Sequence, residues 1–161
     1  MVEASVQTSP VPVFLDTLVD RLELRPNLSG VSVTSAEVAI GAGEYLMFIE
    51  AQEAQRWGSN ARLRRESTIT LEGIIYTVAT GAGEQIIRVA RRRAYELLGE
   101  VEKELRGSTF GHVVAGIDGL ATVESTEVTD IDLDQGVNKG QRWASLRFVV
   151  SARATTVMGE E

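Results

Sequence analysis

The sequence contains no cysteine and a single histidine, His112, among its 161 residues. The lack of cysteine excludes disulfides, thiolate zinc sites and cysteine nucleophiles, and one histidine cannot build a multi-histidine metal centre. No apolar run reaches the roughly 18 residues of a membrane span, and residues 1–3 lack the basic, then apolar, pattern of a signal peptide. We therefore expect no metal, no cofactor and no membrane partner.

Basic residues are also scarce. Sixteen Lys and Arg stand against 23 Asp and Glu, which gives a net charge of −7. Generic binding to nucleic acid needs a basic footprint, so this balance argues against it. The charge is uneven, because residues 61–107 carry a small basic excess between two acidic segments. Such acidity either keeps the protein in solution or lets a polyanion slide past one face without binding.

What the sequence does have is the composition of a folded domain. Hydrophobic residues make up 43% of the chain, and there are only three prolines. The length fits one domain. We predict an N-terminal arm over residues 1–10, a single domain over 11–155 and a C-terminal tail over 156–161.

Hydrophobic periodicity predicts two helices and five strands. The helices are expected over residues 11–24, ended by Pro26, and over 84–106, ended by Gly107. Strands are expected over residues 31–40, 45–49, 67–80, 121–133 and 142–154. Glycine turns at 41–43 and 138–140 indicate hairpins, while the polar residues 51–66 are expected to form a long loop.

This order, α-β-β-β-α-β-β, predicts an α+β fold, in which two helices pack on one face of a largely antiparallel sheet. The strand over 67–80 is apolar on both faces in its second half, so we place it centrally. Gly81-Ala82-Gly83 lies between a strand and a helix, but position 86 is Ile and no P-loop Lys follows, so we predict a turn with positive φ. No serine, histidine and carboxylate constellation is present, and we expect no enzymatic activity.

Four acidic residues share strand parity near the C-terminal end of the chain: Glu124, Asp130, Asp132 and Asp134. Alternation would place them in a row on one solvent face, an arrangement that is costly for like charges without a reason. The last three also resemble the start of a calcium loop. An EF-hand loop would need Gly and Glu where Gln135 and Gln141 stand.

Seven arginines gather in the basic middle segment. Arg88, Arg91, Arg92 and Arg93 lie on the long predicted helix, and Arg62, Arg64 and Arg65 precede the central strand. They are explained either as a solvated surface paired with nearby glutamates or as an interface that docks onto the acidic face of another copy.

The order of these elements resembles the tail terminator (tail completion, head-tail joining) proteins of long-tailed bacteriophages. The resemblance spans about residues 11–154 and rests on the helix over 13–22, the loop with Trp57 and Arg62, the strand over 69–75, the helix over 87–98 and the final hairpin. It implies a structural virion protein, made in the host cytoplasm, that forms a hexameric ring on the head-proximal end of the tail tube. Its implied partners are further copies of itself, the tail tube protein and a neck or head-completion protein.

On this resemblance, DNA passes through the ring without specific binding. The acidic row Glu124, Asp130, Asp132 and Asp134 would face the channel. Contacts with neighbouring subunits or with the tube would come from a second set: Trp57, Arg62, Arg64, Arg65, Arg88 and Arg92. The alternatives are a tail tube or neck subunit, although tube proteins use less helix, and a small cytoplasmic binding domain or enzyme of unknown substrate.

Overall fold

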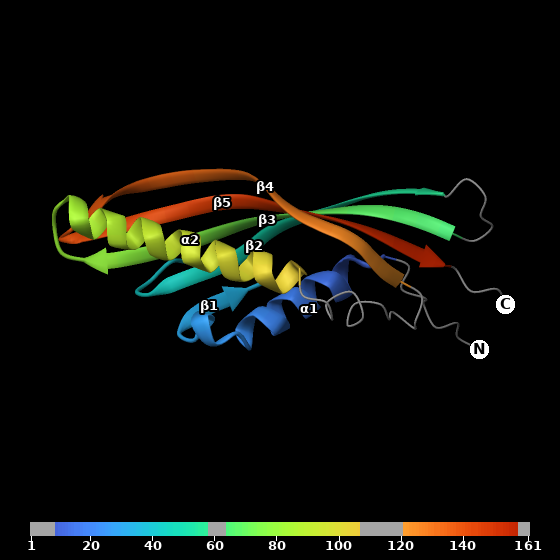
Figure 1. Ribbon diagram of the computed structural model, residues 1–161, viewed down its shortest axis with the longest axis horizontal. Coiled ribbons are helices and arrows are strands. Elements are labelled where there is room, and N and C mark those ends of the chain that lie inside the picture. The colour runs from blue at the N-terminus through green and yellow to red at the C-terminus, as the bar shows by residue number, and fades with distance from the viewer. Residues whose placement is uncertain (1–8, 58–63, 107–120, 158–161) are drawn as a thin grey trace.

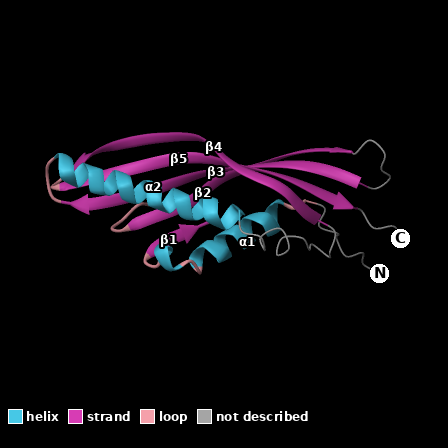
Figure 2. Ribbon diagram, in the orientation of Figure 1, coloured by secondary structure: helices cyan, strands magenta, loops and turns pink. Residues whose placement is uncertain are grey.

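The computed structural model describes residues 9–57, 64–106 and 121–157. The elements are α1 (Val11–Glu23), a 3-10 turn (Pro26–Leu28), β1 (Val31–Thr34), β2 (Glu44–Trp57), β3 (Arg64–Thr80), α2 (Glu84–Arg106), β4 (Ala121–Asn138) and β5 (Gln141–Val157). The strands form one sheet in the order β1-β2-β3-β5-β4 (Figure 1). Both helices lie on the same side of it (Figure 2). The predicted fold class and element order are confirmed, with β3 at the centre.

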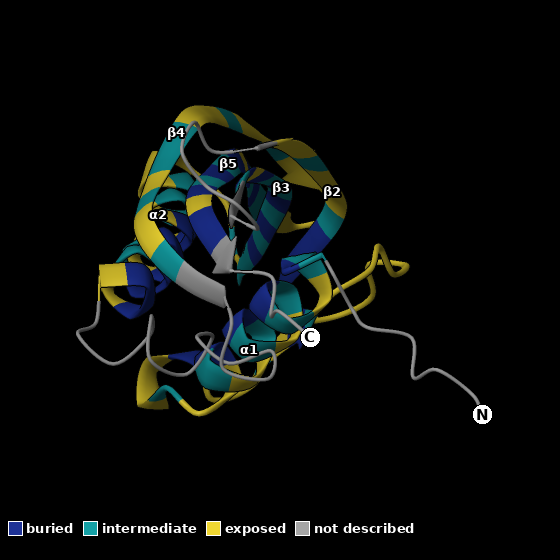
Figure 3. Cartoon of the chain, turned by 90° about the vertical axis from the view of Figure 1, so that its right-hand side faces the viewer, coloured by how far each residue is buried: buried dark blue, intermediate teal, exposed yellow. Residues whose placement is uncertain are grey.

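The core lies between the helices and one face of the sheet, which we call the core face. In β3 this face carries Ile69, Leu71 and Ile75, and in β5 it carries every second residue from Ala144 to Ala154, all of them buried. Both helices direct apolar stripes at it: Phe14, Leu18 and Leu22 from α1, and Ala90, Ala94, Leu97, Leu98, Val101 and Leu105 from α2. Seen from the end, the sheet is curved, and buried residues, in dark blue, lie along β3 and β5 (Figure 3).

The first half of the sheet differs from the prediction in three ways. The region over 31–40 is a strand only as far as Thr34, and β1 pairs with β2 in parallel rather than as a hairpin. The predicted loop over 51–66 is mostly strand, because β2 continues to Trp57 and β3 starts at Arg64. The direction of β1 was missed because alternation indicates a half-buried strand but not the direction in which it pairs. The length of β2 was missed because residues 51–57 are polar, as in a strand near a sheet edge.

The hairpin turn at the end of β4 is confirmed. Strand β4 runs on to Asn138, five residues past the predicted end at 133, and leaves a tight turn at Lys139 and Gly140. Both turn residues have positive φ, 41° and 79°, as a two-residue hairpin turn requires. Gly81 and Gly83, before α2, also have positive φ as predicted.

An ion cluster fixes the end of α1 to α2. Arg25 Nε donates to Glu100 Oε1 at 2.6 Å, and Arg25 Nη1 donates to Glu104 Oε1 at 2.9 Å. Arg21 Nε reaches Glu104 Oε2 at 3.0 Å, and Asn27 Nδ2 reaches Glu100 Oε2 at 2.9 Å. Both glutamates are only 5% exposed. Buried carboxylates are tolerated because each is matched by a cation and further hydrogen bonds.

The ion cluster makes the unfolding free energy depend on pH in the acidic range. The Asn27 amide and the Arg25 guanidinium lower the pKa of Glu100 to about 2, although burial opposes them. A carboxylate with a lowered folded pKa stabilises the fold above its unfolded value, and this contribution is lost as the pH falls through the folded pKa. We expect the unfolding free energy to drop between about pH 4.5 and pH 2 more steeply in the wild type than in Glu100→Gln. Urea titrations across this range measure it.

The matched control is Glu102→Gln, two residues away on α2 and outside the cluster. Equal pH dependence of Glu100→Gln and the wild type would contradict the assignment.

Two glycines should respond in opposite ways to the same change. Around Gly99, inside α2, there is nothing within 4 Å of an added Cβ, so Gly99→Ala is expected to raise the unfolding free energy by about 1 kcal/mol through helix propensity. At Gly73, in β3, an added Cβ would lie 2.4 Å from the buried Phe148 ring. Gly73→Ala should therefore lower the unfolding free energy by about 1 to 3 kcal/mol. Thermal unfolding of both variants checks the pair, and the same sign for both would refute this account.

Candidate functional site

The face of the sheet opposite the helices, which we call the open face, has no helix packed on it within the described residues. It carries the even-numbered residues of β3 and the odd-numbered residues of β5, which alternate with the buried core positions. A sheet whose second face is left uncovered has that surface available for contacts outside the chain. The open face is therefore the candidate site.

An aromatic ladder crosses one end of the open face. The Tyr45 and Tyr76 rings meet edge to face with centroids 6.4 Å apart, and Tyr76 stacks on Trp143 at 6.2 Å. The indole of Trp143 covers Gly136 in β4, where an added Cβ would lie 2.7 Å from the ring. The ladder thus joins β2, β3, β5 and β4, and it stiffens this end of the sheet through cross-strand contacts.

Beside the ladder lies a cavity of about 600 Å³, the open-face hollow. Its apolar lining comes from the strands and includes Met47, Ile74, Tyr76 and Trp143. Val38 and Ile40, from the connection between β1 and β2, line it too although they are 38% and 47% exposed. The Val38 backbone N–H donates to Met47 Sδ at 3.4 Å, which holds this connection against the open face.

Two of the four predicted acidic residues belong to this hollow. Asp132 and Asp134 pair with Arg147 and Ser145 of β5, so register places both on the open face, and both line the hollow together with Glu37. Neither aspartate forms a salt bridge with another described residue. They therefore present negative charge beside an apolar floor.

The other two acidic residues lie at irregularities of β4. Glu124 falls in a bulge between Val123 and Ser125, where its carboxylate accepts a hydrogen bond from Thr155 Oγ1 and lines a separate cavity of about 380 Å³. Asp130 falls in a second bulge, between Thr129 and Asp132, and has a φ of 52°. Each bulge adds one residue and so breaks the simple alternation that predicted one continuous row.

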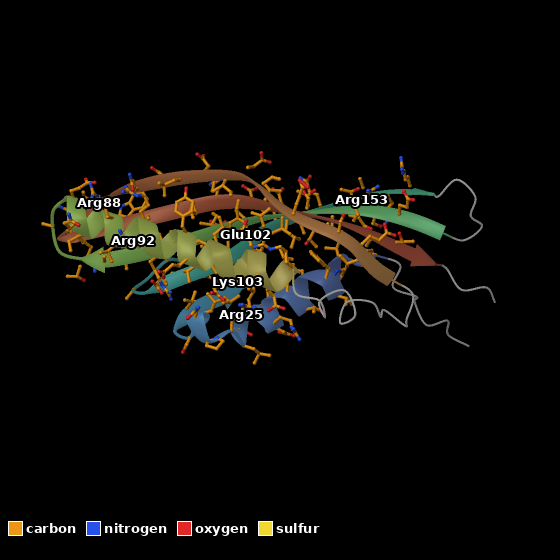
Figure 4. All side chains as sticks on the ribbon, in the orientation of Figure 1. Arg25, Arg88, Arg92, Glu102, Lys103 and Arg153 are labelled. Atoms are coloured by element: carbon orange, nitrogen blue, oxygen red, sulfur yellow. The ribbon has the colours of Figure 1, made fainter. Side chains whose placement is uncertain are left out.

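The predicted basic residues occupy two separate places. Arg88 is exposed on α2 and bonds Glu84 one turn earlier, with Nε 3.1 Å from Oε2. Arg92, also on α2, lines a cavity of about 330 Å³ with Glu44 and Glu96. Figure 4 shows both near one end of the molecule, whereas Arg153 of β5 lies toward the other.

The remaining members of the predicted interface are at or beyond the ends of β2 and β3. Trp57 is the last residue of β2, and Arg64 and Arg65 open β3, with Trp57 paired to Arg65 in the sheet. Arg62 and His112 lie outside the described residues. The hairpin residues and the helical arginines are therefore not one patch.

Arg93, the neighbour of Arg92, is structural. Its Nε lies 3.0 Å from Glu44 Oε2, and its pKa is raised by this hydrogen bond despite partial burial. It ties α2 to the start of β2. Sequence reasoning grouped it with three other arginines, because a run of identical residues does not reveal which one points toward the sheet.

The described residues form no metal-binding cluster. In residues 9–57, 64–106 and 121–157, no group of three or more His, Cys, Asp or Glu side chains is placed to hold a metal ion. The calcium-loop pattern at Asp130, Asp132 and Asp134 lies in a strand instead. No helix in these ranges is long and apolar enough to cross a bilayer.

Val38 and Ile40 are functional candidates that sequence reasoning missed. Their alternation with Glu37 and Ala39 predicted a strand, whereas the structure places them outside regular structure, at the hollow. The one available signal was the glycine-rich run 41–43 directly after them, which separates these apolar residues from the next strand.

Comparison with known proteins identifies a fold relative. No protein family model matches the chain, and no curated protein matches it. A solved structure described as "Virion of native gene transfer agent (GTA) particle" contains a chain of similar fold, with a TM-score of 0.51 and 11% sequence identity. The match covers 91% of this chain and 99% of that one. The shared feature is thus the whole fold.

The bulge at Asp130 gives a testable consequence for β4. A non-glycine residue at a φ of 52° is tolerated best when it is Asp or Asn, and a β-branched residue is strained there. We expect Asp130→Val to lower the unfolding free energy by about 1 to 2 kcal/mol and Asp130→Gly to preserve or raise it. Urea denaturation measures both. Glu127→Val, at a regularly paired position, is the control, and a loss there as large as in Asp130→Val would contradict the strain.

Proposed function

We propose that this chain is a structural virion protein of the tail terminator type, which forms a ring at the head-proximal end of a tail tube. The observation that carries the proposal is the fold match to a chain of a gene transfer agent virion over nearly the full length of both chains. The predicted resemblance to tail terminators, based on the order of elements, points to the same class of particle. A structural role is also compatible with the described residues, which form no metal-binding cluster.

The shape of the sheet supports a ring. Strand β4 forms one edge of the sheet, and beyond Met47, where β1 pairing ends, β2 forms the other. Different surfaces on opposite sides of one subunit favour head-to-tail contacts, which close into a ring when the rotation permits. In such a ring, the acidic residues of β4 would either face the channel and repel the DNA backbone or receive the arginines of a neighbouring copy. The hairpin residues Trp57, Arg62, Arg64 and Arg65, and the helical Arg88 and Arg92, would contact neighbouring subunits or the tube.

Localisation tests the position on the particle. In assembled particles that carry a tagged copy of this chain, gold labelling viewed by electron microscopy is expected at the junction of tail and head. Particles that lack the chain are expected to have tails of uncontrolled length or tails without heads. Label along the whole tail would instead indicate a tube subunit, and label on the head side of the junction a neck subunit.

Light scattering tests the assembly. The assembled ring is expected at six times the 17.5 kDa mass of one chain, either alone or after addition of tail tubes. A chain that remains monomeric under both conditions would contradict the ring.

A further inference from the structure

The open-face hollow is a surface whose chemistry defines what can fill it. Its floor is apolar, and two exposed apolar residues, Val38 and Ile40, also line it. Three acids line it, Glu37, Asp132 and Asp134, against one base, Arg147, which pairs with Glu72 at 3.2 Å. An occupant should therefore combine apolar and cationic side chains in a short segment.

One segment of the same chain has this composition. Residues 58–65 read Gly-Ser-Asn-Ala-Arg-Leu-Arg-Arg, with three arginines, one leucine and no acid. They connect β2 to β3 at the end of the hairpin. One other stretch has as many cations and no acid: residues 85–95 of α2, with four arginines. Two of those four, Arg88 and Arg93, already pair with Glu84 and Glu44, which leaves residues 58–65 as the better complement.

The segment cannot reach the hollow of its own chain. Ten residues of β3 separate Arg64 from Ile74 in the hollow, a span of about 33 Å at 3.3 Å per residue. Because Trp57 and Arg65 are paired, both ends of this connection lie at the far end of β3, and six residues at about 3.6 Å each cannot span that distance and return. The hollow and the segment therefore belong to opposite ends of one sheet.

We infer that the open-face hollow binds residues 58–65 of a second copy of this chain. The inference rests on the proposed ring and names its subunit contact. Leu63 supplies the apolar side chain for the floor, and the arginines pair with Asp132 and Asp134. Because donor and acceptor surfaces differ and lie at opposite ends, each copy binds one neighbour and is bound by another, as a closed ring requires.

The helical arginines are weaker candidates for the same hollow. Arg88 already pairs with Glu84, and Arg92 lies beside Glu44 and Glu96. Their charge is partly met within the chain, whereas Asp132 and Asp134 form no salt bridge with another described residue.

Cross-linking tests the contact directly, because the chain has no cysteine of its own. Ile40→Cys places a thiol at the hollow and Ala61→Cys places one in the segment. The two variants are mixed, one of them with an affinity tag, at the concentration at which light scattering shows the wild-type oligomer, and then oxidised. The control replaces Ala61→Cys by Val89→Cys on α2, where Val89 is 50% exposed, similar to Ile40. We expect at least about tenfold more mixed disulfide from the first pair, since bound neighbours reach millimolar effective concentrations.

Charge reversal provides the second readout. Asp132→Lys with Asp134→Lys should weaken self-association at least about tenfold, and mixing with an Arg62→Glu, Arg64→Glu variant should restore it. Unchanged thermal unfolding of each variant shows that the fold persists.

The outcomes separate this inference from the proposed ring. Oligomers that form normally without the expected disulfide, or with the Ile40 and Val89 thiols joined instead, overturn the contact and leave the ring. A chain that stays monomeric, alone and with tail tubes, overturns both.

Discussion

One-sided burial of the sheet is the constraint on which the other features depend. The core face is closed by α1 and α2, which direct continuous apolar stripes at β3 and β5. Because a short helix such as α1 is marginal without packing, the cluster that joins Arg25 to Glu100 and Glu104 fixes its position from the polar side. Both helices pack on the core face, so the polar and aromatic side chains of the open face have no helix over them within the described residues.

The parts of the fold that follow from periodicity were predictable from the sequence. The apolar stripe of α2 gave its bounds, Glu84–Arg106, and alternation in β3 gave its central place. The parallel pairing of β1 was not predictable, because alternation carries no direction. The length of β2 was also missed, since a strand near a sheet edge is as polar as a loop.

The candidate site was predictable in its residue types more than in its geometry. Asp132 and Asp134 were expected on a solvent face, and register places them on the open face. Glu124 and Asp130 are displaced by bulges, which no simple count of alternate residues reveals. The hollow itself depends on Val38 and Ile40 lying against strands close in space rather than in sequence. Contacts of this kind arise from tertiary packing and leave only a weak local signal.

Strand β4 has a consequence for how the chain avoids unwanted assembly. It is an 18-residue edge strand, and such an edge with free backbone groups is a template for amyloid-like pairing between molecules. Five acidic side chains along it, with two bulges, oppose that pairing: Glu124, Glu127, Asp130, Asp132 and Asp134. The same residues that give the chain its negative end thus act as gatekeepers against aggregation.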